Sequence, residues 1–261
     1  MFLSALFSMS PDSVSIVIPA YNEARRLPPT LSALAEWRLR CTRSVDIIIV
    51  VEPGTDRTRE IATAAAAGQP NLRVLSNEEH RGKGFAVRTG MRAAIGDFIF
   101  YMDADLSVPL QEVNTFLDHF DTHPDVDVLF GNRQHAQSRI TKYQSWLRRH
   151  MGQMFNAILR RLAMIGVYDT QCGFKAFRRC AAESIFARQQ VDGFAFDVEV
   201  LLLAQKLGFK IADLPVEWRN SPESKVRIVR DSFQMLRDAL RIRWMMKGLE
   251  PRGTVHSNHH P

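Results

Sequence analysis

The sequence predicts an α/β fold in which a mostly parallel β-sheet is flanked by helices on both of its faces. Strand-like and helix-like segments alternate through the first half of the chain, which is the pattern of parallel strands joined by crossover helices. Residues 45–51 form a continuous apolar run rich in β-branched side chains, typical of a strand buried on both faces. The 261 residues, of which 46% are hydrophobic, are enough for one domain with a sizeable core.

The first half supplies the main elements of the predicted sheet. We expect strands at 14–19, 45–51, 72–75 and 98–102. We expect helices between them, from the apolar stripe Leu31, Leu34 and Ala35 and from the segments 58–67 and 84–95. Ligands of such sheets bind beyond the carboxyl ends of the strands, so residues that follow a strand are the first candidates for a site.

The second half is less regular. We expect helices at 109–120, 140–165, 196–207 and 229–247, and strands at 126–130 and 211–216. Neither an internal repeat nor a low-complexity linker interrupts the chain. The prediction is therefore a single domain over residues 12–249, between a flexible N-terminal tail, 1–11, and a flexible C-terminal tail, 250–261.

Composition restricts the partners and the compartment. The chain has 34 Lys and Arg against 28 Asp and Glu, and this basic balance favours nucleotides, nucleic acid or anionic lipid. Its three cysteines argue against a disulfide framework or a zinc site and fit a cytoplasmic setting. No apolar run approaches the roughly 20 residues that span a bilayer. We expect a cytoplasmic protein whose membrane contact is peripheral, on the cytoplasmic face.

Asp103 and Asp105 are the first candidates for catalysis. They follow the apolar run 98–102 directly, so both carboxylates can reach the same point at a strand end. Carboxylate oxygens of this kind suit Mg²⁺ or Mn²⁺, which also bind substrate phosphates. The alternative is that these aspartates cap the helix expected near Pro109.

A glycine-rich basic turn, Arg81 to Gly84, precedes the expected helix 84–95. Its glycines allow the backbone to approach a phosphate closely, and Lys83 adds positive charge. The spacing is not that of a P-loop, and taken alone the turn could equally be a basic surface loop.

Together these motifs resemble the inverting family 2 glycosyltransferases of the GT-A fold, which has a Rossmann-like sheet. The resemblance is carried by residues 16–23 (IVIPAYNE), 81–84 (RGKG) and 103–105 (DAD), in this order and spacing. Three further segments resemble the dolichyl-phosphate β-glucosyltransferases: 169–177 (DTQCGFKAF), 194–201 (FAFDVEVL) and 224–226 (SKV). The similarity covers nearly the whole chain, from about residue 14 to about residue 247.

The resemblance implies roles for the matching positions. Pro19, Tyr21, Glu23 and Glu52 would line the nucleotide pocket, and Asp103 and Asp105 would hold the metal and the donor diphosphate. Lys83 would contribute to donor binding, and Arg133 and Arg139 would face the phosphates. Lys225 would close over the diphosphate from a loop. Asp197 and Glu199 lie where some relatives place a base, although a role in orienting the acceptor site or bracing loops is the alternative.

One stretch departs from the family pattern. Where the family shows Asp-Asp-Gly-Ser-x-Asp, this chain has Glu52, Pro53 and Gly54 in a stretch that is shorter by one residue. Glu52 stands for the aspartate that contacts the base, and Pro53 removes a backbone donor. Ser107 stands where related mannosyltransferases often have Gln.

Two basic segments suggest contact with a membrane. Residues 138–161 interleave six Lys and Arg with apolar side chains, and 229–247 place Arg237, Arg241, Arg243 and Lys247 beside Leu240 and Trp244. Such C-terminal amphipathic helices suit an anionic lipid surface. The alternative is that each helix packs on the domain core.

We therefore expect a metal-dependent enzyme that transfers glucose from UDP-glucose to a polyprenyl or dolichyl phosphate. Alternatives are a mannosyltransferase that uses GDP-mannose and a family 2 transferase acting on a saccharide, which would need a base such as Asp197. A nucleic-acid-binding protein is the alternative of another class. No recognised nucleic-acid-binding motif supports it, so nucleic acid is not an expected partner.

Overall fold

The computed structural model describes residues 13–142 and 169–219, together with 237, 238, 240–242 and 244–246. Among the described residues, a seven-stranded sheet has the order β3-β2-β1-β4-β7-β5-β8. Its strands are β1 (Val14–Ala20), β2 (Val45–Val51), β3 (Leu72–Ser76), β4 (Phe98–Met102), β5 (Val128–Asn132), β7 (Phe174–Arg178) and β8 (Ile211–Pro215). A two-stranded sheet pairs β6 (Arg139–Lys142) with β9 (Glu217–Arg219).

The sheet is mostly parallel, as predicted, with one antiparallel strand. β1 pairs in parallel with β2 and β4, β2 with β3, and β5 with β8. β7 lies between β4 and β5 and runs antiparallel to both. The N-terminal end of β7 therefore meets the carboxyl ends of its neighbours at one edge of the sheet.

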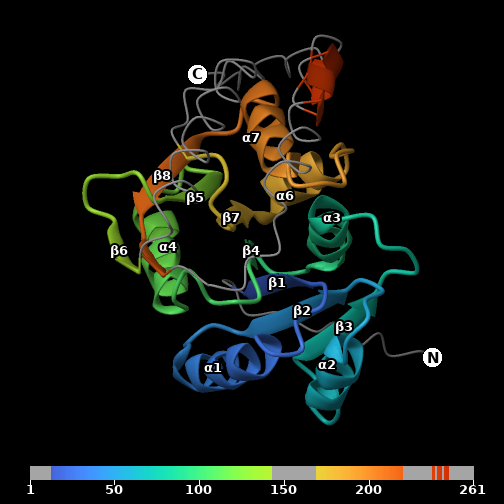
Figure 1. The fold of residues 1–261 in the computed structure, drawn as a ribbon. Helices are drawn as coiled ribbons and strands as arrows, with labels where there is room; N and C mark the ends of the chain where they lie inside the picture. The colour runs from blue at the N-terminus through green and yellow to red at the C-terminus, as the bar shows by residue number, and fades with distance from the viewer. Residues whose placement is uncertain (1–12, 143–168, 220–236, 239, 243, 247–261) are drawn as a thin grey trace, which may run out of the picture.

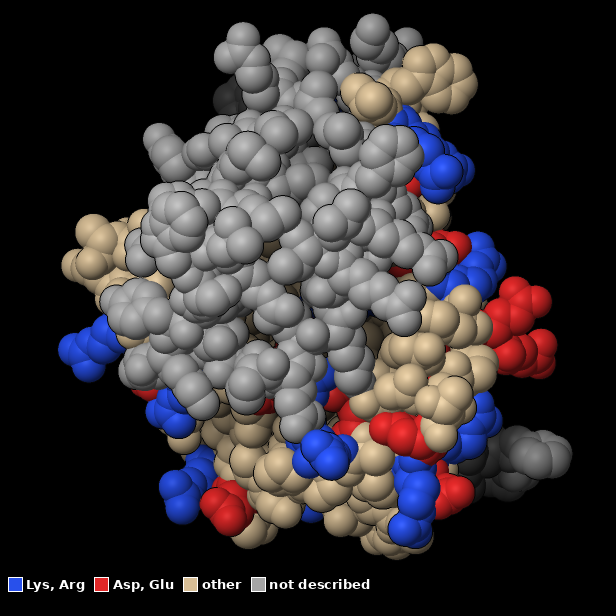
Figure 2. Space-filling view, viewed as in Figure 1, with Lys and Arg blue, Asp and Glu red and all other residues tan. Residues whose placement is uncertain are grey.

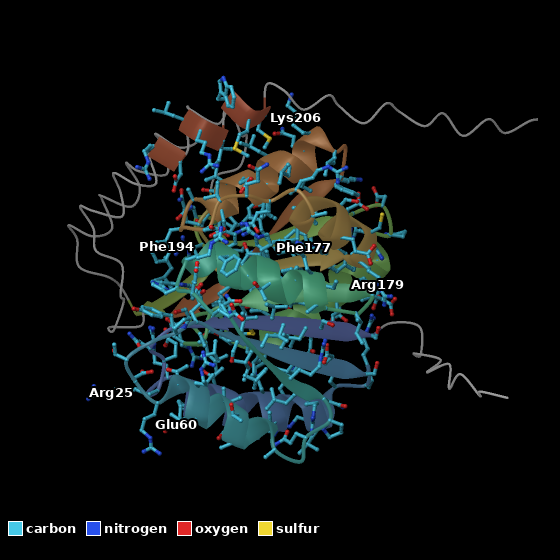
Figure 3. The ribbon with its side chains drawn as sticks, turned by 90° about the vertical axis from the view of Figure 1, so that its right-hand side faces the viewer. Arg25, Glu60, Phe177, Arg179, Phe194 and Lys206 are labelled. Carbon is cyan, nitrogen blue, oxygen red and sulfur yellow. The ribbon has the colours of Figure 1, made fainter. Side chains whose placement is uncertain are left out.

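Helices cover both faces of the sheet (Figure 1). Helices α3 (Lys83–Ala93), α6 (Arg179–Phe186) and α7 (Phe196–Lys206) pack into one hydrophobic cluster. The opposite cluster contains α1 (Leu27–Arg40), α2 (Thr58–Ala66) and α4 (Gln111–Thr122). Phe177 lies fully buried in the interior, whereas Arg25 and Glu60 project from the lower edge (Figure 3).

The buried strands explain their own sequence pattern. In β1, Val17 faces the cluster with α3, while Ile16 and Ile18 face the cluster with α1. Because both faces are covered, almost every residue of such a strand is apolar. Gly90 lets α3 approach β1 closely, since a Cβ there would lie 2.3 Å from Val17 Cγ1.

Several expected elements agree with the structure and others do not. The strands expected at 45–51 and 98–102 are found with the same bounds as β2 and β4. The helix expected from residue 140 is wrong for residues 140–142, because these pair with β9 as part of β6. The rest of that range lies outside the described residues, as do both predicted tails, 1–11 and 250–261.

β7 and α6 were not expected from the sequence. In β7, Lys175 occupies a fully buried position and interrupts the apolar run Phe174 to Phe177 that would have indicated a strand. The charge is tolerated because buried partners surround it, which only the folded chain reveals.

Candidate functional site

Two carboxylates lie at the carboxyl end of β4. Oδ1 of Asp103 is 2.6 Å from the Nζ atom of Lys83, and Oδ2 of Asp105 is 3.3 Å from Nη1 of Arg26. The Asp103 side chain is 37% exposed and that of Asp105 is 15% exposed. The two side chains thus come from one strand end, remain reachable from solvent and attract cationic groups.

Asp105 also shapes the turn that follows it. Its Oδ1 accepts a hydrogen bond from the backbone N–H of Ser107 at 3.0 Å, and Leu106 between them has a φ of 49°. A left-handed leucine is strained, and such strain concentrates at functional sites. The capping alternative is not supported, because α4 begins at Gln111 and its N-cap, Leu110, makes no side-chain capping bond.

Lys83 connects α3 to this carboxylate pair. It is the first residue of α3 and its side chain is 19% exposed. Burial by itself lowers the pKa of Lys83, but the carboxylates of Asp103 and Asp197 more than offset it and raise the pKa above its ordinary value. Lys83 is therefore protonated at neutral pH and places a positive charge beside Asp103.

The three predicted donor-binding residues of the first motif lie at the end of β1. Pro19 is half-buried within the strand, opposite Val50 of β2. Glu23 accepts a hydrogen bond from Arg26 Nε at 2.6 Å, and Arg26 also contacts Asp105, so Glu23 is linked to the carboxylate pair. The ring of Tyr21 stacks on the imidazole of His80, with centroids 3.8 Å apart.

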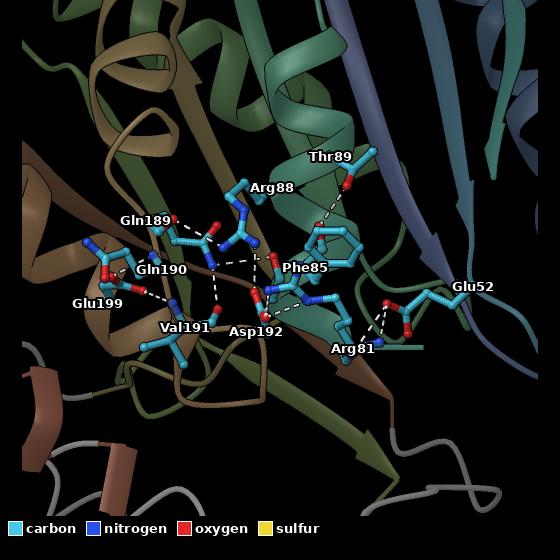
Figure 4. Close-up of polar contacts among 12 residues, drawn as sticks. Glu52, Arg81, Phe85, Arg88, Thr89, Gln189, Gln190, Val191, Asp192 and Glu199 are labelled. Carbon is cyan, nitrogen blue, oxygen red and sulfur yellow. Dashed lines mark hydrogen bonds and ion pairs between the residues drawn. The ribbon is translucent and has the colours of Figure 1, made fainter. Parts of the chain in front are cut away.

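His80 and Glu52 form a contact that the sequence does not reveal. Glu52 is 2% exposed, and its carboxylate contacts Nδ1 of His80. The same carboxylate accepts the backbone N–H groups of Arg81 at 3.4 Å and Gly82 at 3.2 Å (Figure 4). Glu52 thus binds the turn that precedes α3, at the helix end where backbone N–H groups favour an anion.

A network of arginines fastens the loop before α7 to α3. Arg81 and Arg88 both bind Asp192, at 2.6 Å and 2.7 Å (Figure 4). A Cβ at Gly82 would lie 2.7 Å from the Asp192 carbonyl oxygen, and one at Gly84 would lie 2.4 Å from that of Val191. In the described chain, Gly82 and Gly84 therefore allow the backbone of residues 191 and 192 to approach the basic turn closely.

Asp197 and Glu199 are both buried in the first turn of α7. The carboxylate of Glu199 accepts the backbone N–H groups of Gln190 at 2.8 Å and Val191 at 2.7 Å, and burial raises its pKa. Oδ1 of Asp197 lies 2.6 Å from Nζ of Lys175 and also accepts the hydroxyl of Tyr101. These contacts favour the bracing role over that of a base for both residues.

Arg133 lies close enough to Asp103 for their charges to interact, although its own ion-pair partner is another carboxylate. Arg133 follows β5 and binds the fully buried carboxylate of Asp169, with Nε–Oδ2 and Nη2–Oδ1 distances of 2.8 Å. Its guanidinium also lies over the ring of Trp218, 5.5 Å from the centroid. Arg139 is exposed at the start of β6, and Lys225 lies outside the described residues.

A small pocket lies beside the carboxylate pair. Its lining is Met102, Asp103, Ser107, Val108, Gly173 and Trp218. Trp218 was not expected to be part of the site, because β9 contains only three residues and gives no clear sequence signal. Cys172 is not a nucleophile here, since burial raises the pKa of its thiol to about 12.

The donor set fits a hard divalent cation that is shared with a substrate. Among the described residues, no cluster of three or more His, Cys, Asp or Glu side chains could hold a metal by itself. Asp103 and Asp105 nevertheless offer carboxylate oxygens, and the ammonium of Lys83 already sits where a cation is attracted. Mg²⁺ commonly binds through one or two carboxylates completed by water and substrate phosphates, which matches such a two-carboxylate site.

Comparison with known proteins assigns the class. The model of glycosyl transferase family 2 matches residues 15–186, and the chain belongs to this family. Dolichyl-phosphate beta-glucosyltransferase of Dictyostelium discoideum is 34% identical over 241 residues, covering 88% of this chain and 74% of its own length. The human protein of the same name is 32% identical over 252 residues, covering 92% and 78%.

Solved structures confirm the GT-A fold. Glucosyl-3-phosphoglycerate synthase from Mycobacterium tuberculosis, in complex with UDP, superposes with a TM-score of 0.67 at 20% identity, over 93% of this chain and 82% of that one. Mannosyl-3-phosphoglycerate synthase from Rubrobacter xylanophilus gives a TM-score of 0.65 at 20% identity, over 89% and 73%.

The Arg133–Asp169 pair allows a structural role to be separated from a catalytic one. Arg133→Met should destabilise the fold by about 3–5 kcal/mol, because it leaves a buried carboxylate without its partner. Burial by itself raises the pKa of Asp169, but the positive charge and hydrogen bonds of Arg133 lower it by more. The pKa of Asp169 therefore lies below its ordinary value. The stabilisation is therefore present above the unfolded pKa and is lost as the pH falls through the folded one.

The double variant Arg133→Met/Asp169→Leu should recover most of the stability in a urea titration. If the stable double variant also transfers sugar normally, Arg133 has no role at the phosphates.

Proposed function

We propose that the protein is a metal-dependent transferase that moves glucose from UDP-glucose, with inversion, to a polyprenyl phosphate such as dolichyl phosphate. The observation that carries the proposal is the placement of Asp103, Asp105 and Lys83 together at the carboxyl edge of a family 2 sheet. Relatives covering most of the chain are named dolichyl-phosphate beta-glucosyltransferases, which supports this acceptor and sugar.

The proposed reaction needs charge stabilisation more than proton transfer. An oxygen of the acceptor phosphate attacks the anomeric carbon of glucose, and the bond from that carbon to the UDP oxygen breaks. The acceptor oxygen is already anionic at neutral pH, so no base has to be supplied. Lys83 and Arg26 lie where they can offset the charge of the departing diphosphate, and orientation supplies much of the remainder.

Asp103 and Asp105 are the residues that would hold Mg²⁺ or Mn²⁺. When bound, such an ion supplies Lewis-acid stabilisation of the diphosphate leaving group. In glucosyl-3-phosphoglycerate synthase, a protein of the same fold, crystal structures contain Mn²⁺ with UDP and Mg²⁺ with UDP.

The contacts of Asp197 favour a phosphate acceptor over a saccharide acceptor. A saccharide hydroxyl must lose a proton, and Asp197 is the base that the sequence offers for that step. Its carboxylate is buried and engaged by Lys175 and Tyr101. A phosphate acceptor avoids this requirement.

The C-terminal helical segment, defined by its described residues 237, 238, 240–242 and 244–246, supports peripheral contact with an anionic membrane. Asp238, Ile242 and Met246 face inward, and the last two belong to the core cluster beside α7. The opposite face exposes Arg237, Leu240, Arg241 and Trp244, with Leu240 52% and Trp244 75% exposed.

Figure 2 shows basic side chains beside uncharged ones at the upper right, where this segment lies. Such a face suits a lipid surface, with each basic residue contributing about 1 kcal/mol near anionic headgroups. No described helix is long and apolar enough to cross a membrane. We propose that this face docks on the cytoplasmic leaflet. Arg243, Lys247 and residues 143–161, which belong to the two predicted basic segments, lie outside the described residues.

The donor and acceptor can be tested directly. Purified protein, offered labelled UDP-glucose, UDP-galactose or GDP-mannose with a polyprenyl phosphate, should make lipid-linked glucose from UDP-glucose in preference to the other products. Calorimetry with Mn²⁺ should show tighter binding of UDP than of GDP. Preferential transfer from GDP-mannose would move the protein to the mannosyltransferase alternative.

Asp105→Asn should lower kcat on the order of 100-fold, because it removes an anionic ligand at a site of charge stabilisation. EDTA should have the same effect on the wild type, and added Mn²⁺ should reverse it. Asp118→Asn on the exposed surface of α4 is the matched control and should behave as the wild type. Full activity of the wild type in EDTA would exclude the metal role.

The membrane face is tested by Arg237→Gln/Arg241→Gln/Trp244→Ser, which should sediment less with vesicles that contain anionic lipid. The control is Arg40→Gln/Arg57→Gln/Leu39→Ser, which removes the same charge and a similarly exposed apolar side chain, Leu39 being 83% exposed. These residues belong to α1 and to the turn before α2, and both helices lie at the opposite end of the molecule (Figure 1).

The variant Arg237→Gln/Arg241→Gln/Trp244→Ser should also require a higher concentration of long-chain acceptor for half-maximal rate. The concentration required of a short soluble analogue should not change. Equal vesicle binding by both variants would show that this helix face has no lipid contact.

A further inference from the structure

Gly173 lies directly against the carboxylate of Asp103. β4 and β7 pair antiparallel, with Met102 opposite Phe174. Asp103, which follows β4, therefore meets Gly173, which precedes β7, at the edge of the sheet. A Cβ at Gly173 would lie 2.1 Å from Oδ2 and 2.6 Å from Cγ of Asp103. Any side chain at this position would displace the carboxylate, because a Cβ atom does not come so close to an atom to which it is not bonded.

Lys175 holds the loop that contains Gly173. Its side chain is fully buried, and its Nζ atom donates to the carbonyl oxygens of Thr170 at 3.1 Å and Cys172 at 2.8 Å. The third donor contacts Asp197 Oδ1 at 2.6 Å. All three hydrogens of the ammonium are thereby used, and two of them fix the loop backbone on either side of Gln171.

Asp197 connects the same ammonium to β4. Its Oδ1 also accepts the hydroxyl of Tyr101, two residues before Asp103 on β4. One buried ion pair thus joins α7, β4 and the loop 170–173.

Stability alone does not account for this ion pair. Desolvation of two buried charges can cancel their attraction, and apolar replacements of similar volume are often neutral or stabilising. What the pair does provide is a fixed position for the loop 170–173, since Lys175 holds the carbonyls of Thr170 and Cys172 beneath the site.

We propose that Gly173 and the Lys175–Asp197 ion pair form a positioning unit that fixes the Asp103 carboxylate for a divalent cation and the donor diphosphate. The inference rests on the proposed metal site at Asp103 and Asp105. None of the three residues is itself a proposed ligand, so each can be changed while both carboxylates remain.

The first test uses Gly173→Ala and measures Mn²⁺ binding in the presence of UDP by calorimetry. Affinity for Mn²⁺ should fall by about 10- to 100-fold, as it does when groups that orient a metal ligand are altered. Binding of UDP without metal should be unchanged.

Gly208→Ala is the matched control for the first test. Gly208 follows α7 with a φ of 77°, and a Cβ there meets nothing within 4 Å. The control is strained like any alanine at positive φ, but it should bind Mn²⁺ as the wild type does. Wild-type affinity in Gly173→Ala would overturn the positioning role. If the wild type binds no Mn²⁺ with UDP, the proposed metal site fails and this inference fails with it.

The second test separates positioning from stability. Lys175→Met should melt at a lower temperature than the wild type, because it leaves Asp197 buried and unpaired. Lys175→Met/Asp197→Leu should recover the melting temperature and still bind Mn²⁺ about tenfold more weakly. If this double variant recovers metal affinity together with stability, the pair only supports the fold. If it does not fold, Gly173→Ala decides the question.

Discussion

The antiparallel pairing of β7 with β4 is the constraint on which the rest of the site depends. A parallel strand at this place would deliver its carboxyl end to the functional edge, as β1, β2 and β4 do. β7 instead delivers the loop before it, and the register Met102 to Phe174 places Gly173 against Asp103. Asp103 and Gly173 therefore meet at this edge because β4 runs toward it and β7 runs away from it.

The same edge is organised by charges that are paired before any substrate arrives. Lys83 and Arg26 contact the two aspartates, while Glu52 binds the turn from which Lys83 projects. Such groups need little reorganisation when a charged diphosphate enters, and preorganisation of this kind is the main source of electrostatic catalysis.

A second group of charged side chains is buried in the protein, below the charges at the edge of the sheet. Lys175, Asp197 and Glu199 are almost completely buried, and each is satisfied by protein groups. Their contacts hold the loops 170–173 and 189–193, which flank the carboxylates and α3. A buried charge destabilises the fold unless it is paired and all of its hydrogen bonds are made, so these charges favour one arrangement of the two loops.

The sequence by itself determined what depends on local pattern. Continuous apolar runs located β2 and β4 with the observed bounds, and the position of Asp103 and Asp105 followed from the end of β4. Ordered motifs then indicated the family that the comparison confirms.

Only the tertiary structure decided which partners those residues take, because the partners are distant in the chain. His80 beside Glu52, Asp169 beside Arg133 and Gly173 beside Asp103 are separated from them by 28, 36 and 70 residues. Lys175 shows the physical reason most clearly. A charge within a run of five residues argues against a buried strand, and it becomes favourable only when the fold brings Asp197 of α7 beside it and turns the carbonyls of the preceding loop, at Thr170 and Cys172, toward it.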